Sequence, residues 1–335
     1  KGRVSMESPQ REASIHGGAG GLLKPPAAKR HPVATTHHGI TRTDDYAWLR
    51  ADNWQQVVRD PAALAPEIRA YLDAENAYAA ASMADVEELR LRLFDEMRGR
   101  IKEDDSSVPA PDGAYAYSTR YAHGAQHPMI VRSNRDGSEE QVLLDANAMA
   151  EGKAYFRLGG FAHSHDHRLL AYSSDESGNE YFTIRIRDAA TGTDLPDVIA
   201  ETGGSAIWAN DGKTLFYVWI DENHRPAKVY RHIVGSDPAT DVVVYSDPDP
   251  GFFIAIGQTQ SRRFIVIDTH DHETSEARVI DSNEPEGEPR LVAPREVGQE
   301  YSVDHGGDRF FILTNAGSAE DFKVVTAPET APGRA

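Results

Sequence analysis

A serine and several histidines are the residues whose spacing first points to chemistry. The run 203–206, Gly-Gly-Ser-Ala, matches the start of a nucleophile elbow, in which Gly-x-Ser-x-Gly holds a serine on a strained turn between a strand and a helix. That turn needs a small residue two positions after the serine, where this chain has Ile207 followed by Trp208. We therefore expect Ser205 to lie in a loop that enters a strand, and we predict no catalytic residue in this chain.

The histidines offer a metal site as the alternative chemistry. His163, His165 and His167 alternate with other residues, and His270 and His272 form a second group. Zinc ligands converge on one point, usually from a helix or with a carboxylate, and an alternating trio beside a turn is more typical of exposed residues. The sequence has no cysteine, which excludes a thiolate nucleophile and cysteine-ligated metals. We predict no metal ligands and no cofactor.

Carboxylates are numerous, with 53 Asp and Glu residues in 335. Two acids could act as a glycosidase pair, but nothing in the sequence singles out two of them. Residues 106–335 hold 20 basic and 36 acidic side chains, most of the net charge of −18. This balance disfavours nucleic acid, whose phosphates need Lys and Arg, and it favours short basic peptides as partners.

Membrane insertion is not expected. The longest strongly apolar stretches, 252–256 and 264–267, are far shorter than the roughly 20 residues that span a bilayer. The N-terminus is polar and has no apolar signal segment. We expect a soluble, cytoplasmic protein.

The segments around these residues differ in periodicity. Residues 1–30, with the glycine run 17–21, are expected to form a disordered tail, since a phosphate-binding loop would need a strand before the glycines and a helix after them. Residues 31–105 are expected to form a helical arm. Apolar residues recur every three or four positions between 61 and 101, which predicts two helices, the second capped by Ser82, with the alanines of 77–81 packed between them.

Residues 106–326 are typical of β-structure. Short runs rich in β-branched and aromatic residues alternate with turn sequences such as Asp-Gly. The expected strands include 114–120, 169–173, 181–186, 214–220, 264–268 and 309–314. Residues 327–335 are expected to form a second tail.

The β region also repeats. A turn followed by a buried strand recurs at 112, 166, 211, 261 and 306, at intervals of roughly 45 to 54 residues. A period of 40–50 residues with about four strands per unit is the signature of β-propeller blades. We predict a mainly β fold with about five blades in an open arc, whose first and last blades expose apolar faces. A β-sandwich pair is the rival architecture, and a closed five-bladed ring is the alternative to the open arc.

Read together, the arm and the blades resemble the N-terminal part of the prolyl oligopeptidase family of serine peptidases, and within it the oligopeptidase B group. Six motifs carry this resemblance in the family's order. They lie at 42–54, 71–78, 142–147, 208–211, 274–278 and 300–305, and the first contains Trp48 and Trp54, which we expect to anchor the arm.

The resemblance implies a seven-bladed propeller that caps a C-terminal α/β-hydrolase domain with a Ser-Asp-His triad. The present residues cover the arm and about five blades, so we expect the hydrolase domain to be absent, and no triad residue transfers to this sequence. The family role of this portion is gating, and cleavage after Arg or Lys is the activity that the oligopeptidase B group implies once the hydrolase domain is joined. A stand-alone propeller that binds a peptide or protein is the alternative, and a propeller glycosidase or lactonase is a third.

Overall fold

The structure, a computed structural model, describes residues 23–333. The glycine run at 17–21 lies outside the described residues. Contacts between Cα atoms divide the chain into two compact units, Lys1–Ile101 and Lys102–Ala335. None of the helices in residues 23–333 has both the length and the apolar character that a membrane crossing requires.

The first unit begins with a hairpin for which the sequence carries no strand pattern. Strands β1 (Val33–His37) and β2 (Ile40–Asp44) pair antiparallel. The turn residues His38 and Gly39 both have positive φ, 52° and 75°, as two-residue hairpin turns require. Every residue of both strands is exposed. The alternation of apolar and polar residues that reveals a half-buried strand is therefore missing here.

Helices make up the rest of this unit. They are η1 (Ala47–Leu49), α1 (Trp54–Arg59), η2 (Pro61–Ala63), α2 (Pro66–Met83), η3 (Ala84–Val86) and α3 (Glu87–Arg98). The expected cap at Ser82 is wrong, because Ser82 and the alanines of 77–81 lie inside α2. Alanine is the best helix former, so α2 continues through them. Helix α3 starts instead at Glu87, with a second acid at Glu88, where negative charge is favourable.

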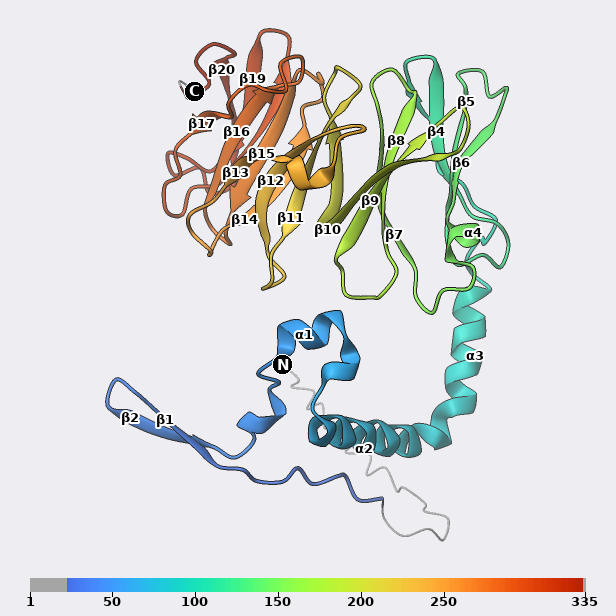
Figure 1. The fold of residues 1–335 in the computed structure, drawn as a ribbon, viewed down its shortest axis with the longest axis vertical. Helices are drawn as coiled ribbons and strands as arrows, with labels where there is room; N and C mark the ends of the chain where they lie inside the picture. Colours follow the sequence, from blue (N-terminus) through green and yellow to red (C-terminus); the bar gives the residue numbers. More distant parts are fainter. Residues whose placement is uncertain (1–22, 334–335) are drawn as a thin grey trace, which may run out of the picture. The chain divides into compact units, whose positions relative to one another are not determined.

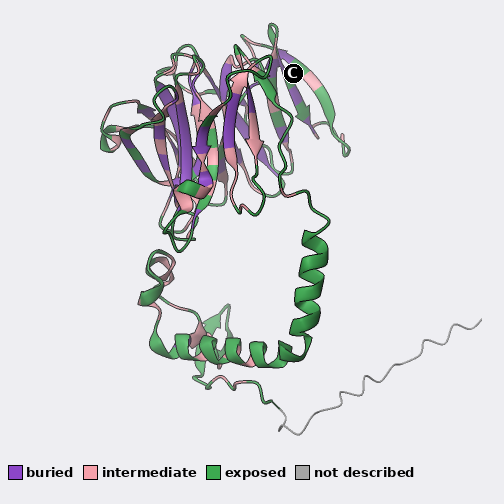
Figure 2. Cartoon of the chain, turned by 90° about the vertical axis from the view of Figure 1, so that its right-hand side faces the viewer, coloured by how far each residue is buried: buried purple, intermediate pink, exposed green. Residues whose placement is uncertain are grey.

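The apolar side chains of the two long helices remain largely uncovered within this unit. Ile68 is the one buried residue between positions 23 and 101, and Figure 2 shows α2 and α3 almost entirely exposed. Leu89, Leu93 and Met97, which recur on one side of α3, are all exposed. Two helices of this length cannot build a core alone, so these apolar side chains have no packing surface within the part of the first unit that the structure describes.

Trp48 fixes the chain before the helices. Its half-buried ring lies 6.2 Å from the Tyr71 ring of α2 and 5.4 Å from that of His31. Its indole Nε1 donates a hydrogen bond of 2.9 Å to the Lys29 carbonyl. Trp54, the other expected anchor, is half-buried at the start of α1. Trp48 therefore ties the segment before β1 to α2.

The second unit consists of five antiparallel blades in chain order (Figure 1). Blade 1 holds β3 (Ala110–Asp112), β4 (Tyr115–Arg120), β5 (Met129–Asn134) and β6 (Gln141–Asp145), followed by α4 (Ala146–Ala150). Blades 2 and 3 hold β7 (Arg157–His163), β8 (Leu169–Asp175), β9 (Phe182–Asp188), β10 (Asp194–Trp208), β11 (Thr214–Ile220), β12 (Pro226–Ile233), η4 (Pro238–Thr240) and β13 (Val242–Ser246). Blade 4 holds β14 (Phe253–Gln258), β15 (Phe264–His270), β16 (Ser275–Asp281) and β17 (Arg290–Ala293). Blade 5 holds β18 (Tyr301–Gly306), β19 (Arg309–Thr314) and β20 (Lys323–Pro328).

Strand β10 belongs to two blades. Its first part pairs with β9 and its second part with β11, so blades 2 and 3 form one seven-stranded sheet. The pairing shifts register between Thr202 and Ala206, and Gly204 there has a φ of +86°. Such a bulge bends a strand and re-aims it. Ser205 therefore lies inside a strand, and the expectation that it lies in a loop is wrong.

The core consists of layers between neighbouring blades. Four clusters of buried side chains lie one at each of the four blade interfaces. Between blades 4 and 5, for example, Phe264 and Val279 pack with Phe310 and Ile312. This face-to-face packing is that of a propeller and not of two stacked sheets.

The two ends of the row differ. In β19 of blade 5, Phe311 and Leu313 point away from blade 4 and are 43% and 45% exposed. In β5 of blade 1, Ile130, Val131 and Arg132 are all buried. The expected exposed apolar face is thus present on blade 5, whereas the central strand of blade 1 is covered on both sides.

A buried charged group joins blades 2 and 3 away from their first strands. His232 of β12 lies between two carboxylates, with its Nε2 2.8 Å from Asp197 and its Nδ1 2.8 Å from Asp241. The Tyr217 hydroxyl donates to the other oxygen of Asp241 at 3.0 Å. Burial alone lowers the pKa of His232, but the two carboxylates raise it overall. His232 and its partners thus form a buried ionic link between β10 and β12.

Candidate functional site

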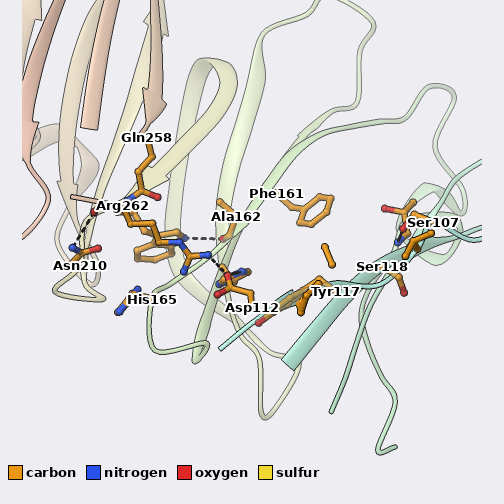
Figure 3. A pocket seen from close by; sticks show the side chains of 16 residues that line it. Ser107, Asp112, Tyr117, Ser118, Phe161, Ala162, His165, Asn210, Gln258 and Arg262 are labelled. Atoms are coloured by element: carbon orange, nitrogen blue, oxygen red, sulfur yellow. Dashed lines mark hydrogen bonds and ion pairs between the residues drawn. The ribbon is translucent and has the colours of Figure 1, made fainter. Parts of the chain in front are cut away.

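A pocket of the second unit lies where the first strands of four blades end. These strands are β3, β7, the second part of β10, and β14, and the end residues Asp112, His163, Trp208 and Gln258 all line the pocket. Its volume is about 680 Å³. Figure 3 shows Asp112 from blade 1 and Gln258 from blade 4 among the side chains that line it. The pocket is therefore a product of blade packing and not of any single segment.

An ion pair spans this pocket. The guanidinium of Arg262, in the turn between β14 and β15, donates to the carboxylate of Asp112 in β3. Blades 1 and 4 are therefore in contact, although two other blades separate them in the sequence. Burial alone raises the pKa of the Asp112 carboxyl, but the hydrogen bond and charge of Arg262, with His163 and His167 adding to them, lower it overall. Asp112 therefore carries its negative charge within the pocket.

The Arg262 turn is fixed from blade 3. The Asn210 side-chain amide donates to the Arg262 carbonyl at 3.2 Å and to Asn283 at 3.0 Å. Beside it, the Trp208 indole donates to the Ala162 carbonyl at 2.8 Å. Blades 2, 3 and 4 are thus tied together at this rim, which holds Arg262 facing Asp112.

Two of the three alternating histidines, His163 and His167, lie close to Asp112. The Nε2 atom of His163 lies 2.9 Å from an Asp112 carboxylate oxygen, and the His163 and His167 rings stack with centroids 4.8 Å apart. Tyr117 of β4 stacks on His163 at 4.3 Å, and its hydroxyl lies 2.8 Å from Nδ1 of His167. The expectation of exposed turn residues is therefore wrong for His163 and His167, which are half-buried. It is right for His165, which is exposed.

The protonation of these groups follows from their surroundings. Burial, with the nearby charges of His163, Arg262 and Arg132, lowers the pKa of His167 below its usual value although Asp112 opposes this. Burial likewise raises the pKa of the Tyr117 hydroxyl. A neutral imidazole and a neutral phenol thus stand beside a charged carboxylate.

The second histidine group does not join this cluster. His270 ends β15, and its Nδ1 lies 2.9 Å from Asp268. Burial raises the pKa of the Asp268 carboxyl, against the opposing effect of His270. His272 follows in the β15–β16 turn. This pair lies at the end of β15 opposite to the Arg262 turn.

Ser205 has no catalytic partner in the part of the chain that the structure describes. It lies exposed in β10, and no hydrogen bond joins its hydroxyl to a histidine of residues 23–333. The prediction of no catalytic residue stays a prediction.

The sequence does not reveal that Asp112, His163, His167 and Arg262 lie together. Only His163 and His167 are close in sequence, and Asp112 and Arg262 are brought to them by the packing of the blades.

Comparisons with known proteins agree with this architecture. The sequence profile of the family described as "Prolyl oligopeptidase, N-terminal beta-propeller domain" matches residues 25–335. Dipeptidyl aminopeptidase BI of Pseudoxanthomonas mexicana is 37% identical over 94% of this chain and 45% of its own length. Protease 2 of Moraxella lacunata is 32% identical over 91% of this chain and 44% of its own length.

A solved structure gives the same result. Oligopeptidase B of Leishmania major superposes on 93% of this chain and 45% of that protein, with a TM-score of 0.84 and 30% sequence identity. The chain thus spans less than half the length of the relatives it matches. The matched part of the Leishmania major protein has the same fold as this chain.

Proposed function

Because this chain belongs to the prolyl oligopeptidase family, whose N-terminal β-propeller domain it matches, we propose a gating role for it. In this proposal it is the non-catalytic portion of a serine endopeptidase similar to oligopeptidase B. Joined to a C-terminal α/β-hydrolase domain, it admits short peptides that are then cleaved after Arg or Lys. A cytoplasmic location remains part of the proposal, and cell fractionation tests it.

The pocket at the strand ends is the observation that carries the gating role. It is lined by four blades and spanned by the Asp112–Arg262 pair. Because this ion pair crosses the opening, an extended peptide can enter it more readily than a folded domain can. The excess of acids over bases in residues 106–335 favours basic peptides, since an acidic surface attracts them from solution.

A second reaction is favoured by one specific observation. Dipeptidyl aminopeptidase BI is 37% identical to this chain, more than the 30% of oligopeptidase B from Leishmania major. Its name describes release of dipeptides from the amino end of a peptide. We therefore hold dipeptide release as the alternative activity of the joined protein.

The two activities leave different products. The protein encoded by the whole open reading frame is incubated with a peptide carrying one internal Arg, and separately with the same peptide carrying Gln there. Fragments ending at Arg, absent for the Gln peptide, support the endopeptidase. Successive dipeptides from the amino end of both peptides support the alternative. Cleavage of neither peptide overturns the proposed function and would favour a binding module.

A further inference from the structure

The cluster of Asp112, His163 and His167 has the composition of a metal site. One ring nitrogen of each histidine and one carboxylate oxygen of Asp112 lie within 4.8 Å of one another. Imidazole and carboxylate together suit Zn²⁺ and its neighbours in the first transition row. We propose that these three side chains bind one divalent transition-metal ion, represented by Zn²⁺, at the pocket between the blades.

The first support is the pair of acceptors around the His163 ring. Its Nδ1 lies 3.0 Å from the Ser164 carbonyl oxygen, and its Nε2 lies 2.9 Å from the Asp112 carboxylate. Both ring nitrogens thus face hydrogen-bond acceptors, and each needs a proton or a metal ion on it. A divalent cation at Nε2, shared with Asp112, takes the place of the second proton while Nδ1–H donates to the carbonyl.

The second support is the outer layer around both histidines. A metal-binding histidine usually donates its other N–H to a carbonyl or another polar group, which fixes the ring. The Ser164 carbonyl serves His163 in this way, and the Tyr117 hydroxyl lies 2.8 Å from Nδ1 of His167. These contacts leave the two Nε2 atoms for the metal.

The turn between β7 and β8 carries His167 to this place. His167 has a φ of +60°, a conformation that non-glycine residues rarely adopt. Arg132 of blade 1 donates to the His167 carbonyl at 2.8 Å and so holds the turn. At Gly113, next to Asp112, an added Cβ would lie only 2.4 Å from the His167 ring, so the glycine makes room for the imidazole.

The distances permit coordination after small side-chain movements. A tetrahedral ion about 2.0–2.1 Å from each ligand needs ligand atoms about 3.3 Å apart. The His163 Nε2 and Asp112 carboxylate oxygen are already closer than this, at 2.9 Å. The ring nitrogen of His167 lies within 4.8 Å of both atoms, so it has to move by no more than about 1.5 Å. Three protein ligands also leave a coordination position for water.

Arg262 competes with the metal. Its guanidinium occupies the Asp112 oxygen that faces His163, and two cations on one carboxylate repel each other. Metal binding is therefore expected to release Arg262, whose side chain is 38% exposed and can turn to solvent. Removing the arginine charge is expected to strengthen metal binding and not to weaken it.

Titration of the full 335-residue chain, purified without a histidine tag, with ZnCl₂ against a chromogenic chelator tests the proposal. His163→Gln, His167→Gln and Asp112→Asn are each expected to weaken binding by about 10- to 100-fold or more. His165→Gln is the matched control, because His165 lies on the same turn outside the cluster, and its affinity is expected to stay within twofold. Arg262→Gln is expected to tighten binding several-fold.

Two further measurements guard the result. Circular dichroism of each variant shows whether it folds. A gain in affinity, as expected for Arg262→Gln, cannot result from loss of folding. The visible absorption of bound Co²⁺ is expected in the wild-type chain and lost in the His163→Gln/His167→Gln variant. Equal Zn²⁺ affinity in the wild type and that double variant, or an equal loss in His165→Gln, overturns the proposal. Failure to bind Zn²⁺ tighter than about 0.1 mM also overturns it, since a built site binds far more tightly than that.

Discussion

Arg262 holds the carboxylate of Asp112 across 150 positions of sequence, and it does so between blades 1 and 4, which are not neighbours. The contact joins two blades that are not adjacent and places one positive and one negative charge at the pocket. The Arg262 side chain is 38% exposed and that of Asp112 is 18% exposed, so solvent reaches the guanidinium more than the carboxylate.

The first prediction concerns the stability that this pair contributes. We expect Arg262→Gln to lower the free energy of unfolding by only about 0.5–1 kcal/mol, since partly exposed ion pairs contribute little. The radius of gyration should rise, because the substitution cuts the ion pair that links blade 1 to blade 4. Urea unfolding and small-angle scattering measure the two effects. A loss above about 3 kcal/mol, the cost of breaking a buried pair, would show that Arg262 supports the core instead.

The second prediction concerns pH and His232. The raised pKa of His232 means that the folded state binds its proton more tightly than the unfolded state, whose value is near 6.5. This contribution to stability is fully present below that value and is lost as pH rises through the folded-state pKa. Removing one member of a buried charged group costs about 3–5 kcal/mol. We expect His232→Gln to cost about that much at pH 6 and less at pH 9.

Urea unfolding of the wild type and His232→Gln between pH 5.5 and 9 measures this difference. His165→Gln, which is exposed, should show none. A difference that grows with pH would mean that His232 is neutral in the folded protein.

The third prediction concerns Trp48 in the arm. Its half-buried ring contacts Tyr71 and His31, so truncation should cost less than the 3–5 kcal/mol of a fully buried tryptophan, about 1–3 kcal/mol. The loss should fall on the first unit. Limited proteolysis of Trp48→Ala should cut residues 23–101 faster while leaving the blades intact. Unchanged proteolysis together with weaker peptide binding would make Trp48 a ligand residue instead of an anchor.

The fourth prediction concerns the exposed face of blade 5. Phe311 and Leu313 present apolar surface on β19, and exposed apolar patches favour association. We expect the 335-residue chain to self-associate despite its charge of −18, and Phe311→Ser with Leu313→Asn to shift it toward monomer in sedimentation. Val297→Ser, at an isolated and 99% exposed loop residue, is the control. A compact monomer of wild-type chain in small-angle scattering would contradict the open arc.

The fifth prediction is that the 335-residue chain alone hydrolyses no Arg or Lys ester. Ser205 lies in a bulged strand, and within residues 23–333 no histidine is hydrogen-bonded to its hydroxyl. A nucleophilic serine depends on such a base. Measured turnover that disappears in Ser205→Ala would reverse this interpretation of the serine.

Turn chemistry explains how well the strands were predicted. Strands Thr214–Ile220 and Arg309–Thr314 have the bounds expected from the sequence, because Asp-Gly or Gly-Asp turns end the preceding segments sharply. The β1–β2 hairpin was missed because both its faces are exposed. The length of β10 was missed because Gly203 and Gly204 are typical of a loop, whereas they form a bulge within a strand.

The candidate site was less predictable than the fold. The spacing of His163 and His167 is visible in the sequence, but it does not tell which of the three alternating histidines face inward. That choice depends on the positive φ of His167 and on the stacking of Tyr117 from another blade. Asp112 and Arg262 join the two histidines at the pocket only once blades 1 to 4 have packed together.

The strand that blades 2 and 3 share has a consequence for how the molecule opens. Neither blade can lose β10 without removing a strand from the other, so their backbone amides should exchange hydrogen with solvent as one cooperative block. Blades 4 and 5 are separate sheets and can open without breaking that block's hydrogen bonds. Thermal fluctuations should therefore divide the row at the boundary between β13 and β14 before they divide it inside β10, leaving a seven-stranded remnant as the last protected part.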